Sequence, residues 1–556
     1  MKSIKGKLSA KQYLLALIIV LAAFLRLWQL GSIPPSVSID EASIGYNAYS
    51  VIKTGLDEYG SFPLVSQRGY DDWRRSTYLF LTIPFIKLFG LNAVSIRLPS
   101  VILSILTILA IYFIVLRLFP KQANFPQNLA LSAAFLLAIS PWHIYISRLG
   151  HESNAYLSFF VFGLLFFYWG FKNKPLLIIS AIFLLLSTVS YYAGQVFIPP
   201  FIFGLILIYR ENIFSAIKSS RAMIFATLTI GLVSIPIFWN LFSHSAMIRY
   251  QGTSIFNPGY HYQELIKLHE LKSKAMQNND YLGKILYSDR LFNLKVIVSG
   301  YFSHFNFSWL TTNPAGNDPF KAPGLGLIDM WWLIFGLAGM IILLFNNHED
   351  KKTKLTVYLW LILAPLPGAV ATQAPHAMRA YTLLPVFIFF SAIGAIFILE
   401  KLSKYKTAVL LTLLMFVTVS LAKFYRNYFI RFPKEQSAAY SYDGAKAFAY
   451  AFTQQNKYQK IVFSNQKNLY QSYMLYLYYS KYDPEQYQLQ GGTVSGGFAR
   501  FHKIGKYEFR PIVWSSDKLM KDTLLIGNVS EFPRSIIPAQ VFRLLNGETT
   551  LIAAGT

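Results

Sequence analysis

Two adjacent carboxylates mark the first place in the chain where the sequence could perform acid–base chemistry. Asp40 and Glu41 lie in the segment SIDEASIGYNAYSVIKTG, which follows the first apolar run and has the spacing of an amphipathic helix. A carboxylate held at a membrane surface can take a proton from an attacking hydroxyl. Acidic residues are also common in the first turn of any helix, because they stabilise the helix dipole. We predict a general base here, with Asp40 as the first candidate and Glu41 as the second.

Paired arginines follow in the same polar segment. Arg74 and Arg75 come just before a short apolar stretch, Ser76–Gly90, and Asp72 lies just ahead of them. Guanidinium groups can bind a lipid phosphate through paired hydrogen bonds, although basic residues also anchor a chain among lipid headgroups. The stretch Ser76–Gly90 is short for a span, so we expect it to lie in the membrane interface as a helix.

A second group of polar residues lies in the segment ISPWHIYISRLGHESN, at the end of a predicted membrane span. Charged side chains are rare and costly in membrane segments, so such a group indicates a functional site. We predict that Arg148 binds an anion. His151 and Glu152 could form half of a metal site, but two neighbouring residues do not define a coordination geometry.

Two later segments bring further hydrogen-bond donors to the same predicted side of the membrane. His376 and Arg379, in ATQAPHAMRAYTLLP, are three residues apart and would point two donors at one anion from a single helix face. An arginine that extends from a helix end toward the headgroups is the simpler alternative. Tyr192 and Gln195, in YYAGQV, are candidates for contacts to a sugar or an acceptor.

The composition indicates that membrane helices position these residues. The chain of 556 residues is 54% hydrophobic and 14% charged, whereas soluble domains carry about 25% charged residues. Repeated apolar runs therefore predict a polytopic membrane protein. No cysteine is present, which excludes disulfides, thiol nucleophiles and cysteine-ligated zinc. The net charge of +25 is attributed to topology and anionic lipid, and no nucleic-acid partner is expected.

Eleven membrane spans are predicted from the apolar runs. They cover approximately residues 13–30, 93–118, 126–141, 153–171, 175–191, 195–209, 221–241, 326–346, 355–372, 379–400 and 407–424. With the N-terminus in the cytoplasm, every inner loop carries more Lys and Arg than Asp and Glu, as the positive-inside rule requires. We therefore expect a multi-pass protein of the cell membrane with its long connections, about 31–92 and 242–325, outside the cytoplasm.

The C-terminal part differs in composition from the membrane region. We divide the chain into a membrane domain, residues 1–425, and an extracytoplasmic domain, residues 426–556. The second part is more polar and is predicted to be a small α/β domain. Within it, QKIVFSN and RPIVWSS have the residue types of strands, and DGAKAFAYAF has those of a helix.

Several of these segments resemble the GT-C superfamily of membrane glycosyltransferases. The branch they resemble most is that of the protein O-mannosyltransferases and aminoarabinose transferases, glycosyltransferase family 39. The resemblance covers about residues 10–425 and is carried by SIDEASIGYNA, LFGLNAVSIRLPS, SPWHIYISRLGHESN and PHAMRAYTLLP. It implies the GT-C fold, an α-helical membrane domain of about eleven spans, here joined to the small C-terminal domain.

The resemblance also implies an activity: a sugar carried on a polyprenyl phosphate passes to a protein, lipid or glycan acceptor outside the cytoplasm. Asp40 matches the catalytic acidic residue of the family's first outer loop. Arg74 or Arg75 falls where relatives place a basic phosphate ligand, although their usual Lys-Pro step reads Arg-Arg-Ser here. The predicted site comprises Asp40 and Glu41 as catalytic residues, Arg74, Arg75, Arg148, His376 and Arg379 as phosphate ligands, and Asp72, His151, Glu152, Tyr192 and Gln195 as contacts to sugar or acceptor.

The expected mechanism is a single displacement with inversion at the sugar C1, because no activated nucleophile for a covalent intermediate is evident. Asp72 falls near an acidic residue that some relatives use to bind metal, but it has no identifiable histidine partner. We expect no obligatory cofactor or metal, with a divalent metal ion as the open alternative.

Three other functions fit the same composition. A transporter or flippase of lipid-linked sugars would show internal repeats and charges near the membrane midplane, whereas the charges here lie at the outer helix ends. A glycan polymerase or ligase would differ only in using a diphosphate-linked donor. A non-catalytic scaffold would not depend on Asp40.

Overall fold

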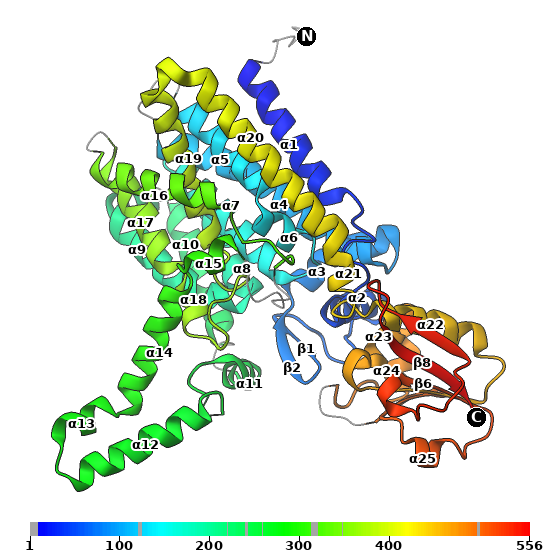
Figure 1. Ribbon diagram of the computed structural model, residues 1–556. Coiled ribbons are helices and arrows are strands. Elements are labelled where there is room, and N and C mark those ends of the chain that lie inside the picture. Colours follow the sequence, from blue (N-terminus) through cyan, green and yellow to red (C-terminus); the bar gives the residue numbers. More distant parts are fainter. Residues whose placement is uncertain are drawn as a thin grey trace.

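The computed structural model describes residues 9–119, 125–219, 221–239, 243–257, 259–312, 321–346, 349–496 and 501–556. Most of the described chain is helical. Figure 1 shows a bundle of helices at the top and left and a domain that contains a sheet at the lower right. This arrangement confirms the predicted fold class, a helical membrane domain followed by a small α/β domain.

Each of the eleven predicted spans contains a helix. These are α1 (Ala10–Leu27), α4 (Ala93–Leu118), α5 (Phe125–Ile139), α7 (Glu152–Gly170), α8 (Leu176–Ser190), α9 (Tyr192–Ile217), α10 (Arg221–Trp239), α16 (Met330–Phe345), α17 (Lys351–Leu363), α19 (Leu383–Lys401) and α20 (Lys406–Phe424). Among the described residues, six helical segments are long and apolar enough to cross a membrane alone, or seven if α5 and α6 (Pro141–Ser147) form one bent span. The chain is thus a multi-pass membrane protein, while eleven crossings stay a prediction.

Two predicted spans have different boundaries in the structure. The one predicted at 355–372 ends at Leu363 and is followed by the short helix α18 (Leu366–Ala369). The next helix begins at Leu383, because the prolines in PLPGAVATQAP interrupt the helical hydrogen-bond pattern. His376 and Arg379 lie in the turns before it, so the prediction that they share a helix face is wrong.

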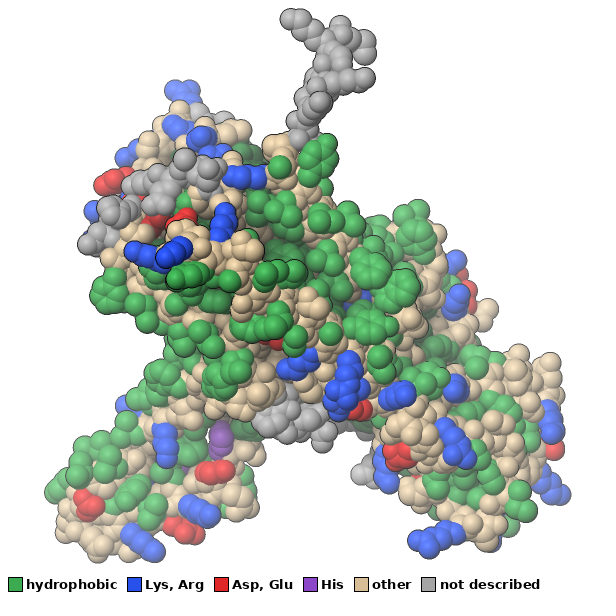
Figure 2. Space-filling view, turned by 45° about the horizontal axis from the view of Figure 1, so that its top comes forward, with side chains coloured by type: hydrophobic (Ala, Val, Ile, Leu, Met, Phe, Trp, Pro, Cys, Tyr) green, Lys and Arg blue, Asp and Glu red, His purple; other side chains and the backbone are tan. Residues whose placement is uncertain are grey.

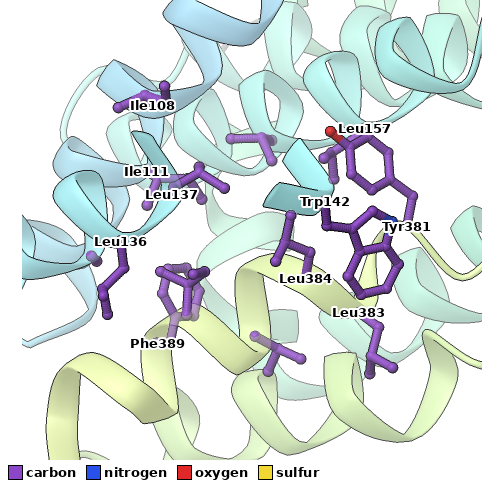
Figure 3. Close-up of a cluster of buried hydrophobic side chains, with 14 of the residues drawn as sticks. Ile108, Ile111, Leu136, Leu137, Trp142, Leu157, Tyr381, Leu383, Leu384 and Phe389 are labelled. Carbon is purple, nitrogen blue, oxygen red and sulfur yellow. The ribbon is translucent and has the colours of Figure 1, made fainter. Parts of the chain in front are cut away.

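The core of the bundle holds those turns in place. Figure 3 shows Trp142, Tyr381 and Leu384 packed together at the start of α19. The rings of Trp142 and Tyr381 lie 5.9 Å apart, and Trp142 Nε1 donates a hydrogen bond to the carbonyl oxygen of Ala377 at 3.2 Å. A buried indole whose N–H has an acceptor keeps its packing energy without an unsatisfied donor. The segment that carries Arg379 is therefore fixed by apolar packing.

Close contact between backbones joins α16 and α19. A Cβ atom on Gly339 would lie 1.9 Å from the carbonyl oxygen of Phe390, and one on Gly394 would lie 2.1 Å from that of Phe335. Small residues allow two helices to approach in this way, and van der Waals packing then stabilises the pair in a membrane.

The first long connection folds into a helix, a hairpin and a second helix. They are α2 (Ile39–Thr54), the antiparallel strands β1 (Ser66–Gly69) and β2 (Asp72–Arg75), and α3 (Thr77–Phe89). Ser38 and Glu41 form a capping box at the start of α2, and Gly55 ends it in the left-handed conformation that glycine adopts easily. The helix predicted at Ser76–Gly90 is confirmed as α3, and its location in the interface stays a prediction.

The second long connection is also helical. It contains α11 (His244–Thr253), α12 (Tyr262–Gln277), α13 (Tyr281–Leu286), α14 (Asp289–Ser303) and α15 (Phe307–Thr311). In Figure 1, α12, α13 and α14 form an arm that projects from the bundle at the lower left.

A mixed sheet organises the C-terminal domain. The α20 helix continues through η3 (Tyr425–Arg431) and α21 (Phe432–Glu435) into this domain. Its elements are α22 (Tyr442–Gln454), β3 (Lys460–Phe463), α23 (Ser472–Ser480), α24 (Pro484–Leu489), β4 (His502–Ile504), β5 (Tyr507–Phe509), α25 (Trp514–Asp517), β6 (Thr523–Asn528), β7 (Gln540–Arg543) and β8 (Thr549–Gly555). The strand order is β4-β5-β3-β6-β8-β7, with β3 parallel to β5 and β6 and the remaining pairs antiparallel.

One strand and one helix of this domain were correctly predicted, and a second strand was not. QKIVFSN contains β3 and DGAKAFAYAF lies within α22. The strand predicted at RPIVWSS is wrong, because the strand β5 ends at Phe509 and the helix α25 begins at Trp514. Arg510 instead donates two hydrogen bonds to Asp517, at 2.9 and 3.0 Å, which stabilise a turn between these elements.

Candidate active site

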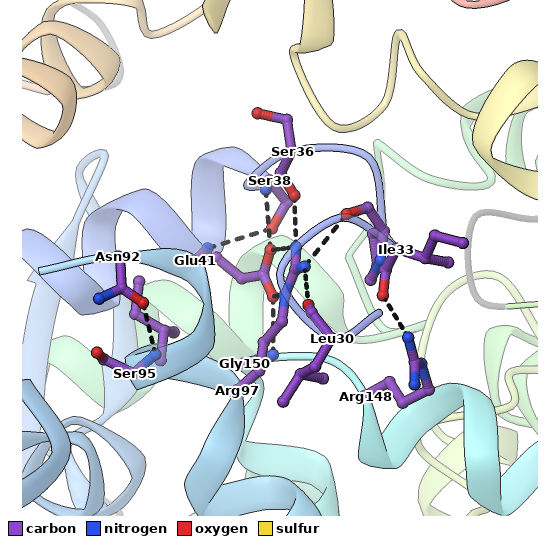
Figure 4. Close-up of polar contacts among 12 residues, drawn as sticks. Leu30, Ile33, Ser36, Ser38, Glu41, Asn92, Ser95, Arg97, Arg148 and Gly150 are labelled. Atoms are coloured by element: carbon purple, nitrogen blue, oxygen red, sulfur yellow. Dashed lines mark hydrogen bonds and ion pairs between the residues drawn. The ribbon is translucent and has the colours of Figure 1, made fainter. Parts of the chain in front are cut away.

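The capping box of α2 directs its two acidic residues to different environments. Glu41 points into the protein, where it is 2% exposed. Figure 4 shows that it accepts hydrogen bonds from Arg97 Nε at 2.8 Å, Arg97 Nη2 at 2.9 Å and the backbone N–H of Gly150 at 2.9 Å. Arg97 also donates to backbone carbonyl oxygens of the segment between α1 and α2, including that of Leu30 at 2.9 Å. Glu41 therefore holds the start of α2 in place and does not face a substrate.

Asp40, the neighbouring residue, is accessible. Its side chain is 43% exposed, and its Oδ1 accepts a hydrogen bond from Arg74 Nη2. Partial burial alone would raise the pKa of Asp40. The nearby charges of Arg74, His151 and Arg249 lower this pKa by a larger amount. The resulting pKa lies below that of an ordinary aspartate, so the carboxylate is ionised at neutral pH.

The hairpin places its two arginines on opposite sides, because successive side chains alternate along a strand. Arg74 points to Asp40. Arg75 donates to Ser66 Oγ at 2.9 Å and lies over the ring of Tyr192, 4.6 Å from its centroid. With its amide oxygen turned toward Arg75, Gln195 accepts a hydrogen bond from Arg75 Nε at 2.8 Å. Arg75 thus fastens the hairpin to the start of α9.

A further arginine enters the site from α11. Arg249 Nη1 donates a hydrogen bond to Asp72 Oδ2, so Asp72 is paired with an arginine from another segment of the chain. Burial and, to a smaller extent, the charge of Arg379 lower the pKa of Arg249 to about 10, although the charge of Asp40 partly offsets them. Asp40, Arg249 and Arg379 are therefore close enough for their charges to interact.

A cavity of about 540 Å³ lies between these elements. Its walls come from the start of α9, from α11, and from α18 with the segment that follows it. Arg249 and Arg379 supply its charge, Gln195 and Tyr192 lie at its wall, and most of the remaining lining is apolar. Arg379 is held there by a hydrogen bond to the carbonyl oxygen of Thr372. A cavity with two cations and apolar walls fits an amphiphilic anion.

Four of the five predicted phosphate ligands do not line the cavity: Arg74 and Arg75 in the hairpin, and Arg148 and His376. Arg148 is fully buried and donates to the carbonyl oxygens of Leu25, Arg26 and Ile33, at 3.2, 2.8 and 2.8 Å, as Figure 4 shows for Ile33. It fastens α6 to the end of α1, so its assignment as a phosphate ligand is corrected. His376 is 6% exposed, and its backbone N–H donates to His304 Nε2 at 3.2 Å. It packs behind the cavity and does not line it.

His151 and Glu152 lie at the edge of the site. His151 caps α7, where its Nδ1 accepts a hydrogen bond from the backbone N–H of Ser153 at 3.1 Å, and its Nε2 is 3.8 Å from Glu152 Oε2. Its charge contributes to the low pKa of Asp40. Within the described ranges, no three His, Cys, Asp or Glu side chains form a group that could hold a metal ion.

The C-terminal domain reaches this site through the first long connection. Glu58 is fully buried and accepts hydrogen bonds from Asn47 Nδ2 at 3.1 Å, Tyr473 OH at 3.2 Å and Thr493 Oγ1 at 2.8 Å. At the hairpin tip, Ser495 donates a hydrogen bond to Asp71. The domain thus contacts both α2 and the hairpin.

Arg249 and Glu58 were not predicted as site residues. Arg249 is the single Lys or Arg residue of HSAMIRYQGT, and an isolated arginine in a long connection between apolar runs is the one signal that could have drawn attention to it. Its partner Asp72 is 177 residues away, so nothing local indicates the pair.

Comparison with known proteins supports this description of the fold. Residues 77–239 match the sequence model of the dolichyl-phosphate-mannose-protein mannosyltransferases. The structure is similar to that of ArnT from Cupriavidus metallidurans bound to undecaprenyl phosphate, with a TM-score of 0.53, 12% identity and 98% of each chain covered. The chain has the GT-C fold. The apo oligosaccharyltransferase of Archaeoglobus fulgidus is also similar, with a TM-score of 0.50, 13% identity, and 94% of this chain and 70% of that one covered.

The match to another structure of the Archaeoglobus fulgidus enzyme, in complex with Zn and sulfate, has a TM-score of 0.49 and 15% identity. It covers 84% of this chain but only 61% of that one. No curated protein matches this chain in sequence. The GT-C fold thus accounts for the helical bundle with its attached sheet domain, whereas the residues of the site must be assigned from their own chemistry.

Proposed function

We propose that this chain is an inverting glycosyltransferase that moves a sugar from a polyprenyl-phosphate donor to an acceptor on the extracytoplasmic face of the membrane. The main support is the cavity that joins apolar walls to Arg249 and Arg379, close to the accessible carboxylate of Asp40. A polyprenyl phosphate combines the same features, a phosphate and a long apolar chain. The ArnT structure with a similar fold was solved with undecaprenyl phosphate.

Arg249 and Arg379 bind the phosphate of the donor. Charge-assisted hydrogen bonds from guanidinium groups to phosphate are strong and directional. As the bond between the sugar C1 and the phosphate oxygen breaks, that oxygen gains negative charge. Two fixed cations that already line the cavity stabilise this charge more in the transition state than in the ground state.

Asp40 orients and deprotonates the acceptor. Arg74 binds its Oδ1, which leaves Oδ2 to face the acceptor hydroxyl. The acceptor oxygen attacks C1, its proton passes to Oδ2, and the phosphate departs with the electron pair of the broken bond. Attack opposite the departing phosphate inverts the configuration at C1. The low pKa of Asp40 keeps the carboxylate ionised and ready to accept the proton.

Glu41, Arg97 and Arg75 act as positioning residues in this proposal. The buried pair of Glu41 and Arg97 fixes the first turn of α2, from which Asp40 projects. Arg75 fixes the hairpin that carries Arg74. Loss of any one of them would displace Asp40 or its partner without removing the base itself.

Release of sugar from a panel of polyprenyl-phosphate sugars tests the proposal. The assay compares the purified wild-type protein with Asp40→Asn and uses nucleotide sugars as control donors. A general base contributes about 10²–10⁴-fold to a rate, so we expect the variant to lose at least about 10²-fold in turnover. Asp522→Asn is the matched control, because Asp522 is exposed in the C-terminal domain and its backbone φ of 49° suits asparagine.

Each outcome of this assay decides between assignments. Turnover of one lipid-linked donor that is lost only in Asp40→Asn supports both the activity and the base. Equal turnover by Asp40→Asn and the wild-type protein contradicts the assignment of the base. No turnover with any donor, in the presence of acceptor extracts, favours transport of lipid-linked sugars instead. Turnover of a diphosphate-linked donor alone favours the polymerase or ligase alternative.

A further inference from the structure

The arm formed by α12, α13 and α14 exposes an unusual amount of apolar surface. Thirteen large hydrophobic side chains between residues 260 and 302 are exposed: Tyr260, Tyr262, Ile266, Leu271, Met276, Tyr281, Leu282, Ile285, Leu286, Leu291, Leu294, Val298 and Phe302. At the tip, Tyr281 is 78% exposed and Leu282 is 67% exposed. Only Ala275, Gly283 and Gly300 of these three helices are buried. The arm therefore has almost no core of its own, and a surface of this kind marks an interaction site.

The pattern of side chains on α12 is that of a helix lying at an interface. Gln263, Lys267, Glu270 and Lys274 recur at intervals of three and four residues and form one polar face. The opposite side carries mainly leucine and methionine, namely Leu265, Leu268, Leu271 and Met276, with the polar residues Glu264, His269 and Lys272 among them. A helix with one polar face and one mainly apolar face is typical of segments that lie in a membrane interface.

The apolar surface of α14 continues from the bundle to the tip. Leu291, Leu294, Val298 and Phe302 are all exposed and are spaced three or four residues apart, so they form one stripe along the helix. At the base of this stripe, Tyr301 OH donates a hydrogen bond to the carbonyl oxygen of Ile362 in α17, at 2.9 Å.

The base of the arm is thus attached to a helix of the membrane bundle. Ile362 is itself 56% exposed, and Phe302, beside Tyr301, is 64% exposed. The stripe on α14 therefore continues the apolar surface that the bundle presents to lipid.

The charges of the arm favour a membrane over a protein partner. Between residues 260 and 302 there are six basic residues, Lys267, Lys272, Lys274, Lys284, Arg290 and Lys295, and four acidic ones, Glu264, Glu270, Asp280 and Asp289. The tip itself carries Lys284 between exposed apolar residues. Basic residues beside aromatic and aliphatic ones are the composition of segments that bind the headgroup layer of anionic membranes. Figure 2 shows the lower-left lobe, which is this arm, with hydrophobic side chains spread over it and charged ones among them.

We propose that the arm lies on the outer leaflet of the membrane that the bundle spans, with α13 and the α14 stripe inserted among the lipid headgroups and upper acyl chains. The occupant of the apolar surface is lipid with an anionic headgroup. Since α11, which carries Arg249, directly precedes the arm, membrane contact also fixes one wall of the cavity relative to the bilayer. The proposal rests on the exposed surface and holds whatever donor the cavity accepts.

Single-cysteine labelling tests the arm directly, because the natural chain contains no cysteine. A nitroxide is attached to Leu282→Cys on the tip and to Leu294→Cys on the stripe, in nanodiscs of phosphatidylcholine and phosphatidylglycerol. Lys267→Cys, on the polar face of α12, is the matched control. Collision with oxygen, which concentrates in lipid, is compared with collision with a water-soluble nickel chelate.

We expect the ratio of oxygen to nickel collisions to be several-fold higher at residues 282 and 294 than at residue 267. Equal ratios at all three sites, with ready access to nickel, would overturn the proposal, since the arm would then be in water. Poor access of both reagents to residue 282 would also overturn it, because a protein partner would then cover the tip. Each labelled variant must elute and unfold as the wild-type protein does.

Charge reversal supplies a second, independent measurement on a fully folded protein. Lys284→Glu should lower the oxygen-to-nickel ratio at residue 282 in nanodiscs that contain phosphatidylglycerol and leave it unchanged in pure phosphatidylcholine. An equal effect in both lipids would contradict the role of anionic headgroups.

Discussion

Replacing Glu58 by glutamine is expected to remove a pH-dependent part of the stability of the contact between the C-terminal domain and α2. Glu58 accepts hydrogen bonds from Asn47, Tyr473 and Thr493, and no part of it is exposed. Burial outweighs these hydrogen bonds and raises the pKa of Glu58 from 4.5 to about 7. One pKa unit corresponds to about 1.4 kcal/mol, so the pKa shift of Glu58 contributes about 3 kcal/mol to the pH dependence of the free energy of unfolding.

The direction of this pH dependence follows from proton linkage. The folded chain holds the Glu58 proton more tightly than the unfolded chain, so proton binding stabilises the folded state. This stabilisation is fully present below the unfolded pKa of 4.5 and is lost as the pH rises through the folded pKa of about 7. Glutamine has no such proton, so the variant should not lose this part of its stability between about pH 5 and about pH 8.

Thermal unfolding of detergent-solubilised protein across this pH range measures the effect. The wild-type protein and Glu58→Gln are compared with Glu485→Gln, whose side chain is exposed on α24 of the same domain. We expect the wild-type protein and Glu485→Gln to lose stability in parallel as the pH rises, and Glu58→Gln to lose less. If all three curves stay parallel, Glu58 does not titrate in this range and the reasoning is refuted.

Three further substitutions test the bundle and the site. Gly394→Ala should destabilise the protein by about 1–3 kcal/mol, because its Cβ would meet a backbone carbonyl oxygen of α16 at 2.1 Å. Gly231→Ala is the control and should not destabilise it, because a Cβ there meets nothing within 4 Å. Thermal unfolding compares the two variants. Glu41→Gln should lower the free energy of unfolding by about 3–5 kcal/mol in the same assay, because it leaves a buried arginine without its counter-ion. Arg249→Gln should lower kcat/KM for the donor about 10- to 100-fold, and Arg534→Gln, at an exposed position of the C-terminal domain, should leave it unchanged.

The sequence indicates local structure well where a short motif decides it. The apolar runs predict the helices of the bundle, because each run is long enough to bury its backbone in hydrocarbon. The start of α2 follows from Ser38 and Glu41, whose spacing is that of a capping box. Asp40 then follows in the first turn of this helix, and its predicted role as the base stays a proposal.

Partners distant in sequence could not be predicted in this way. Arg148 and Arg379 are the same residue type in similar predicted positions, yet one donates to buried carbonyl oxygens and the other lines the cavity. Glu41 is next to Asp40, but it pairs with Arg97, 56 residues away. The chemistry of a side chain is set by its residue type, whereas its availability is set by tertiary contacts that no local pattern encodes.

The hairpin links the C-terminal domain to the chemistry of the site. Its turn residues Tyr70 and Asp71 have φ angles of 57° and 63°, in the left-handed region that costs about 1–3 kcal/mol for such residues unless contacts compensate. One such contact comes from Ser495 of the C-terminal domain, which donates to Asp71. The next strand begins with Asp72, bound to an arginine of the cavity, and continues to Arg74, bound to Asp40. A domain that stabilises this turn therefore also stabilises the positions of Asp40 and Arg249 relative to each other.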